Sequence, residues 1–231
     1  MAAAVCACLV ECSAPPAAEQ SATTSPVPST TTTPTTAAPV PPPPAPTPAV
    51  VEPVTADELG ATWKPDCPVG PASLRRVEVN YLGFDKQTHR GELIVHRDVV
   101  ADAVAIFGQL YELGYPIAAM RSVADYPGAE DELSMRDNNT SAFNCRPMPS
   151  GRGWSLHAYG RAIDVNPLMN PYLDSEGNLE PATAGPYLDR NRTDPGMLHA
   201  NDPAVRTFTD RGWRWGGNWR SPKDYQHFER D

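Results

Sequence analysis

Residues 155–164 read SLHAYGRAID and residues 224–229 read DYQHFE, so each segment carries a histidine and a carboxylate. His157 and Asp164 are seven positions apart, a separation of about 10.5 Å along a straight helix and about 23 Å along a strand. Neither geometry lets both side chains reach one ion, so the chain is predicted to double back between them. Gly160 can take the positive φ that such a turn needs. Asp164 then points back toward the histidine from the following strand.

His227 in the second segment completes a candidate metal site. Together with His157 and Asp164 it gives three zinc ligands and leaves a fourth position open, which is typical of catalytic rather than structural zinc. Asp224, three residues before His227, is a candidate general base for water that the metal activates. The alternative for Asp224 is an orienting contact with His227, and for the three ligands it is a pair of unrelated polar turns.

Hydrophobic periodicity predicts the elements around these motifs. Alternation at 77–81 and 93–95, separated by a polar turn, predicts a β-hairpin. Apolar positions spaced by three and four then predict a helix that Asp98 caps and Gly114 ends. The remaining predicted elements are a strand at 117–123, a long loop at 125–154, a strand at 161–165, a helix at 203–211 and a C-terminal strand. This order predicts an α+β domain with a mainly antiparallel sheet and flanking helices.

The proline content divides the 231 residues into two parts. Thirteen of the 27 prolines fall between Pro15 and Pro53, and that stretch has no aromatic residue. It buries too little apolar surface to offset the ordering of its backbone, about 1 to 2 kcal/mol per residue. Residues 15–63 are therefore predicted to be a disordered Pro/Thr/Ala-rich linker, and residues 64–231 the folded domain.

The charge distribution narrows the classes of partner. The net charge is -9, residues 1–63 contain no Lys or Arg, and from Lys64 onward 23 acidic residues accompany 19 basic ones. A nucleic-acid-binding domain usually has a basic excess or stripe, so no nucleic-acid partner is expected. No stretch approaches the ~20 apolar residues of a membrane-spanning helix.

Residues 1–14 are interpreted as a partial signal or lipoprotein-like segment. The run MAAAVCACLV is short and apolar but lacks a basic start. Cys6, Cys8 and Cys12 are candidates for lipidation, which would tether the chain to a membrane. The alternative is a remnant without a role. An apolar start followed by a Pro/Thr-rich spacer favours export to the cell envelope, either surface-anchored or secreted.

Only Cys67 and Cys145 fall in the predicted folded domain. An even pair in an exported domain predicts one disulfide, and two buried free thiols are the alternative. The bond would close a loop of 78 residues and add about 4 kcal/mol in the chain-entropy model.

The pattern SxHxxGxAxD followed by DxxHFE resembles the M15 family of zinc peptidases, the D-alanyl-D-alanine carboxypeptidases and L-alanyl-D-glutamate endopeptidases of bacterial cell walls. The resemblance implies the Hedgehog/DD-peptidase fold and Zn²⁺ as cofactor. It implies His157, Asp164 and His227 as ligands and Asp224 as catalytic base.

Two further roles follow from the resemblance. In the family an arginine upstream of the first histidine binds substrate or polarises the scissile carbonyl, and Arg121 stands in the corresponding place. The Ser155 position belongs to the family's substrate pocket. The implied function is hydrolysis of peptidoglycan stem peptides. The chain is expected to be a monomer. The alternatives are a non-catalytic zinc domain that binds wall peptide or a partner protein, and a stalked adhesin without metal.

Overall fold

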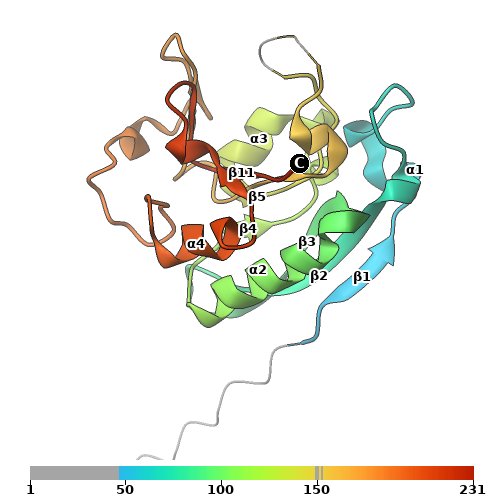
Figure 1. The fold of residues 1–231 in the computed structure, drawn as a ribbon, viewed down its shortest axis with the longest axis horizontal. Coiled ribbons are helices and arrows are strands. Elements are labelled where there is room, and N and C mark those ends of the chain that lie inside the picture. Colours follow the sequence, from blue (N-terminus) through green and yellow to red (C-terminus); the bar gives the residue numbers. More distant parts are fainter. Residues whose placement is uncertain (1–46, 149–150, 152) are drawn as a thin grey trace, which may run out of the picture. The chain divides into compact units, whose positions relative to one another are not determined.

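The computed structural model describes residues 47–148, 151 and 153–231 (Figure 1). The α-helices are α1 (Ala56–Leu59), α2 (Val100–Glu112), α3 (Asp131–Arg136) and α4 (Pro203–Thr209). The strands are β1 (Val50–Pro53), β2 (Leu74–Leu82), β3 (Thr88–His96), β4 (Ala119–Met120), β5 (Asn139–Thr140), β6 (Ala162–Asp164), β7 (Tyr172–Leu173), β8 (Leu179–Glu180), β9 (Arg214–Trp215), β10 (Lys223–Asp224) and β11 (His227–Glu229). None of the helices in these ranges combines the length and apolar character needed to cross a membrane.

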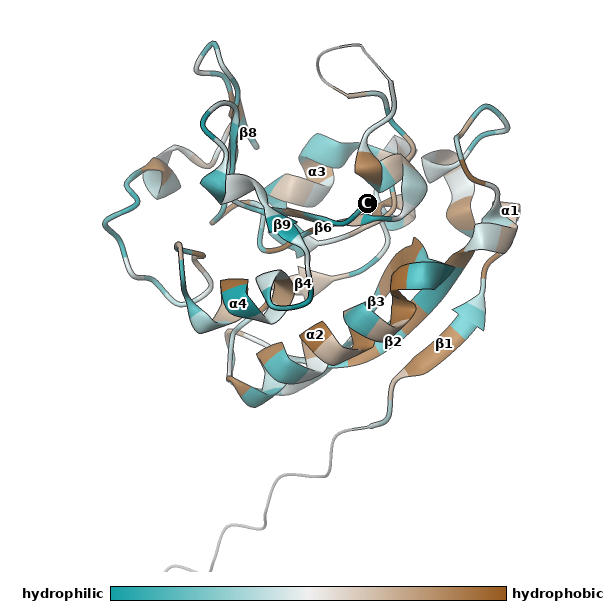
Figure 2. Cartoon of the chain, in the orientation of Figure 1, coloured by the Kyte–Doolittle hydropathy of each residue, from teal (hydrophilic) through white to brown (hydrophobic). Residues whose placement is uncertain are grey.

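The predicted hairpin and the helix after it form one half of the core. β2 and β3 pair antiparallel from Leu74 opposite His96 to Leu82 opposite Thr88. The apolar residues of α2, among them Phe107, are buried against this hairpin, and the polar side of the helix faces away (Figure 2). β1 adds a third, antiparallel strand at the other edge of β2.

Three smaller sheets make the other half. β6, β11 and β9 form one antiparallel sheet, β10, β7 and β8 form a second, and β4 pairs with β5 in parallel. Phe228 of β11 stacks on Phe208 of α4 with the ring centroids 3.8 Å apart. The predicted α+β class and mainly antiparallel pairing are confirmed, while the Hedgehog/DD-peptidase assignment stays a prediction.

The predicted boundary at Lys64 is wrong for residues 50–63. β1 pairs with β2, and Leu59 of α1 is fully buried in a small core cluster with Leu74. Thr55 and Glu58 cap α1 reciprocally. These residues fold because β2 supplies a partner strand that is distant in sequence. Residues 1–46, with the three candidate lipidation cysteines and 11 of the 13 prolines between Pro15 and Pro53, lie outside the described residues.

Three local predictions are also corrected. The strand predicted at 117–123 is only β4, because Ser122 caps a 3-10 turn that begins at Val123. The loop predicted at 125–154 contains α3 and β5. Asp98 does not cap α2, since Val99 holds the N-cap position, and the Asp98 carboxylate pairs with Arg161 at 2.7 Å.

Candidate metal centre and active site

The chain reverses direction at Gly160, as the motif predicts. Ser155 caps the 3-10 turn Leu156–Tyr159, and its Oγ accepts a hydrogen bond from the His157 N–H at 3.3 Å. Gly160 then has φ 67°, and a Cβ there would lie 2.6 Å from the backbone nitrogen of His96. Only glycine fits both the conformation and the space. The chain returns as β6, and Asp164 pairs in register with His227 of β11.

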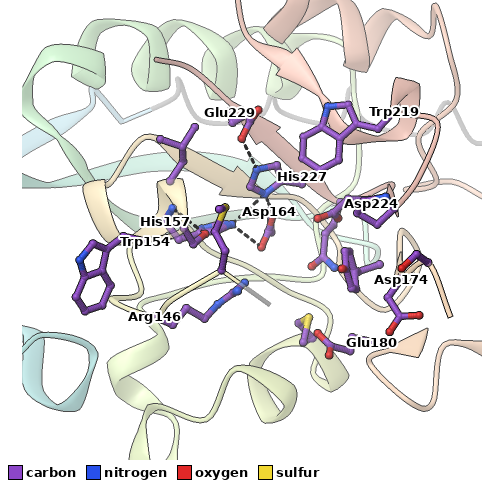
Figure 3. A pocket seen from close by; sticks show the side chains of 18 of the residues that line it. Arg146, Trp154, His157, Asp164, Asp174, Glu180, Trp219, Asp224, His227 and Glu229 are labelled. Carbon is purple, nitrogen blue, oxygen red and sulfur yellow. Dashed lines mark hydrogen bonds and ion pairs between the residues drawn. The ribbon is translucent and has the colours of Figure 1, made fainter. Parts of the chain in front are cut away.

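The three predicted ligands meet at this register. His157 Nε2 lies 3.1 Å from His227 Nδ1 and 3.1 Å from Asp164 Oδ2, and His227 Nδ1 lies 3.1 Å from Asp164 Oδ1 (Figure 3). All three side chains are buried, with at most 9% of each exposed. Their ligand atoms lie within 4.8 Å of one another, a spacing that one metal ion can bridge.

In each imidazole, the hydrogen bond made by the nitrogen outside the cluster determines whether the nitrogen inside the cluster carries a proton or a lone pair. His157 Nδ1 donates to the carbonyl oxygen of Ala142 at 2.5 Å, and His227 Nε2 donates to Glu229 Oε2 at 3.3 Å. In neutral imidazoles, His157 Nε2 and His227 Nδ1 therefore present lone pairs to each other and to the Asp164 carboxylate. Acceptors alone converge on this point, so it requires a cation, either a proton or a metal ion. The donor set, two nitrogens and one carboxylate, fits zinc.

The same contacts shift the pKa values of the metal-free site. Burial opposes ionisation of Asp164, but the charges and hydrogen bonds of His157 and His227 hold its pKa well below the ordinary range. Burial lowers the pKa of His227, but hydrogen bonds to Asp164 and Glu229 outweigh it and raise that pKa to about 10. A proton therefore occupies the cluster at neutral pH when no metal is bound.

Asp224 lies beside the cluster on β10. Gly216 lets the chain approach closely, because a Cβ there would lie 2.8 Å from the Asp224 Cβ. Asp224 Oδ1 is buried and has no hydrogen-bond partner among the described residues. Burial, with a smaller contribution from the Asp164 charge, raises the pKa of Asp224 to about 7, against the opposing effect of His227. A carboxylate with this pKa can both accept and return a proton near neutral pH.

A cavity of about 720 Å³ opens over the cluster. The three ligands and Asp224 lie at its floor, and Trp154 and Trp219 are among its walls (Figure 3). The Trp219 ring lies 5.5 Å from that of His227. Ser155, the predicted substrate-pocket residue, lines the cavity but also caps the turn that carries His157. The volume is adequate for a short peptide.

Arg121 does not reach this cavity, which corrects its predicted place. Its guanidinium donates to the Tyr126 hydroxyl at 2.8 Å and pairs with Asp137. Arg146, which the sequence analysis missed, lines the cavity instead and lies 2.9 Å from Asp131. In the sequence, the feature that could have pointed to Arg146 is its position directly after Cys145.

The predicted disulfide between Cys67 and Cys145 is confirmed, with a Cα–Cα distance of 6.0 Å. It joins the segment after α1 to the segment that carries Arg146. The Cys145 N–H also donates to the carbonyl oxygen of Thr62 at 3.0 Å. The backbone beside Arg146 is thus held by a covalent bond and a hydrogen bond.

Residues 149–230 match the family described as D-alanyl-D-alanine carboxypeptidase. This region contains the three clustered side chains and Asp224, and it confirms the resemblance to the M15 peptidases. This match supports a peptidase of the M15 D-Ala-D-Ala carboxypeptidase family. Comparisons with curated proteins and with solved structures gave no match.

Proposed function

We propose that this protein is a zinc-dependent peptidase that hydrolyses peptide bonds in peptidoglycan stem peptides, of the D-Ala-D-Ala carboxypeptidase or L-Ala-D-Glu endopeptidase type. The observation that carries the proposal is the convergence of acceptor atoms from His157, Asp164 and His227 on one buried point at the floor of a cavity. The family match over the same residues supports a peptide as substrate.

A zinc ion held by these three residues would polarise a carbonyl oxygen and lower the pKa of water toward about 7. Asp224 is not part of the cluster and has a free, buried carboxylate oxygen. In the proposed reaction Asp224 accepts the proton of the attacking water and returns it to the amine that leaves. Its raised pKa suits both steps.

Arg146 takes the place that the resemblance gave to Arg121. It lines the cavity, whereas Arg121 is engaged by Tyr126 and Asp137. Its guanidinium is suited to a carbonyl oxygen or a terminal carboxylate of the substrate, since it presents several fixed N–H donors. Arg146 is oriented by its ion pair with Asp131 and by the disulfide of the preceding residue, Cys145.

We further propose that the protein acts in the cell envelope after export. The support is the disulfide, which persists in oxidising compartments, together with the apolar start and the Pro/Thr-rich stretch of the sequence. A wall polymer is fixed in place, and a long N-terminal segment would give the domain reach toward it.

The test is digestion of purified muropeptides by the full chain, with and without a chelator, followed by mass spectrometry. Asp224→Ala should abolish cleavage and retain zinc in metal analysis, while Asp210→Ala, which removes an exposed carboxylate outside the cavity, should preserve both. Cleavage by Asp224→Ala at near wild-type rate would show that the assigned base is wrong. A zinc-loaded chain that binds but never cleaves muropeptides would establish the non-catalytic alternative.

A further inference from the structure

The guanidinium of Arg190 lies over the ring of Tyr225, the residue that directly follows Asp224. The distance from the Arg190 Cζ to the ring centroid is 4.2 Å, at which a cation and an aromatic face attract each other. Neither Arg190 nor Tyr225 is among the described residues that line the cavity, so neither is placed to contact a substrate there. Their contact therefore concerns the position of Asp224 rather than what the cavity binds.

The backbone of Tyr225 is held from two directions. Its N–H donates to the carbonyl oxygen of Pro171 at 3.2 Å, and its carbonyl oxygen accepts from the Trp215 Nε1 at 2.9 Å. Tyr172, directly after Pro171, is the register partner of Asp224. The strand that carries Asp224 is thus fixed to the segment of Pro171 and Tyr172, and the position of this segment sets that of the carboxylate.

Arg190 also holds the residues directly before this segment. It donates to the carbonyl oxygen of Met169 at 3.0 Å and to Oδ1 of Asn170, which is fully buried, at 3.3 Å. It further donates to the carbonyl oxygen of Leu198 at 2.6 Å, and the Leu198 N–H donates to the same Asn170 Oδ1 at 2.8 Å. One guanidinium therefore contacts both the ring that follows Asp224 and the segment that leads to its partner strand.

This set of contacts suits a guanidinium in particular. A guanidinium presents several N–H donors in a fixed plane and can stack on an aromatic ring at the same time, whereas an ammonium group is a point charge on a flexible stem. The acceptors of Arg190 within the described ranges are uncharged oxygens, three of them backbone carbonyls at Met169, Tyr187 and Leu198. These bonds therefore fix the course of the backbone.

Resting on the proposed peptidase function, we propose that Arg190 is a positioning residue for the general base Asp224. It acts through the ring of Tyr225 and through the segment that ends at Tyr172. Displacement of a reacting group by about 1 Å can lower a rate about a hundredfold. The metal ligands are carried by the 3-10 turn Leu156–Tyr159, β6 and β11, so loss of Arg190 should slow proton transfer and leave the metal in place.

The test measures kcat and KM for muropeptide hydrolysis, and the Kd for zinc, in variants of the full chain. Arg190→Met keeps an unbranched apolar stem but no donor, and it should lower kcat about ten- to a hundredfold while KM and the zinc Kd stay within about twofold. Arg190→Lys keeps the charge and should recover part of kcat. Expressing kcat per bound zinc removes the contribution of unfolded chains.

Arg192→Met is the matched control. Arg192 lies two residues further along the chain, stacks over the ring of Tyr187 at 4.8 Å and donates to the carbonyl oxygen of Pro186 at 3.0 Å. It thus loses the same kinds of contact, but none of its described contacts involves Tyr225. Arg192→Met should therefore keep kcat near that of the wild type.

Variants of Tyr225 test the route of the effect. Tyr225→Phe keeps the ring and should stay near wild type, whereas Tyr225→Leu should lower kcat as Arg190→Met does. If Arg190 acts through the ring, the double variant loses less than the product of the two separate losses. A full product overturns the inference, because the two residues then act independently.

Wild-type kcat in Arg190→Met, or a zinc affinity that falls in proportion to kcat, also overturns the inference. If the wild type hydrolyses muropeptides in that experiment, the proposed function stands and only the role of Arg190 is refuted. If the wild type hydrolyses none, the proposed function is refuted, together with the base that Arg190 would position.

Discussion

Zinc affinity is expected to rise steeply with pH, because His227 must release a proton before its Nδ1 can bind the metal. The pKa of His227 is raised to about 10 in the metal-free site. At pH 7 the displacement of this proton costs about 4 kcal/mol, at 1.36 kcal/mol per unit. The apparent Kd for zinc should therefore fall about tenfold for each pH unit between 7 and 9.

Glu229→Gln tests the origin of this pH dependence. Glu229 accepts from His227 Nε2 at 3.3 Å and is itself held by Arg214 at 2.8 Å. Loss of its charge lowers the pKa of His227, which weakens competition by the proton, and also loosens the orientation of the ring. We expect an affinity loss of about tenfold or more at pH 9, where no proton competes effectively in the variant, and a smaller loss at pH 7.

The assay is competition against a chromogenic chelator from pH 6.5 to 9, with calorimetry in two buffers of different ionisation enthalpy to count released protons. Glu130→Gln serves as the charge-matched control. The wild type should release about one proton at pH 7.5. A zinc Kd that stays constant from pH 7 to 9 after correction for the chelator would refute the reasoning, since it would mean that no proton occupies the cluster.

Replacing Cys67 and Cys145 by Ser should lower the free energy of unfolding by about 4 kcal/mol, because the disulfide closes a 78-residue loop. Urea denaturation measures this free energy, and a decrease of less than about 1 kcal/mol would contradict the loop-closure argument. Gly160→Ala should weaken zinc binding and lower Tm, since its Cβ would meet backbone at 2.6 Å, and an unchanged Kd would count against this turn as the support of the site. Arg121→Ala should leave muropeptide kcat/KM within about twofold of wild type, because its guanidinium is outside the cavity. In metal-free protein, the stability that the His227 proton supplies is fully present below pH 6.5 and is lost as the pH rises to about 10, which thermal melts at pH 6, 8 and 10 would reveal.

The His157 and Asp164 part of the metal cluster could be predicted from the sequence because its geometry is local. The separation of His157 and Asp164 excludes a straight helix or strand, and Gly160 between them supplies the one conformation that returns the chain. His227 could be added because DxxHFE repeats the pairing of a histidine with carboxylates. The first of these inferences depends on short-range constraints that the residues themselves impose, whereas His227, 63 residues from Asp164, was assigned by its motif.

The errors concern residues whose places are set by partners distant in sequence. Arg121 follows β4, and the direction of its side chain depends on Asp137, which belongs to a stretch that shows no periodicity. β1 has the composition of the linker before it and becomes a strand only because β2 offers an edge. Arg146 reaches the cavity through a bond between cysteines far apart in the chain. No pattern local to these residues encodes such contacts.

The site is divided between two sheets, and this division has a functional consequence. The sheet of β6, β11 and β9 holds Asp164 and His227, with Phe228 between His227 and Glu229 directed into the core. The sheet of β10, β7 and β8 holds Asp224 and Glu180. Asp224 lies where the two sheets meet, three residues before His227. Substrate preference is therefore expected to change with the sequence of the β7–β8 turn, whose Asp174, Ser175 and Glu176 line the cavity and are not register partners of Asp224, Asp164 or His227.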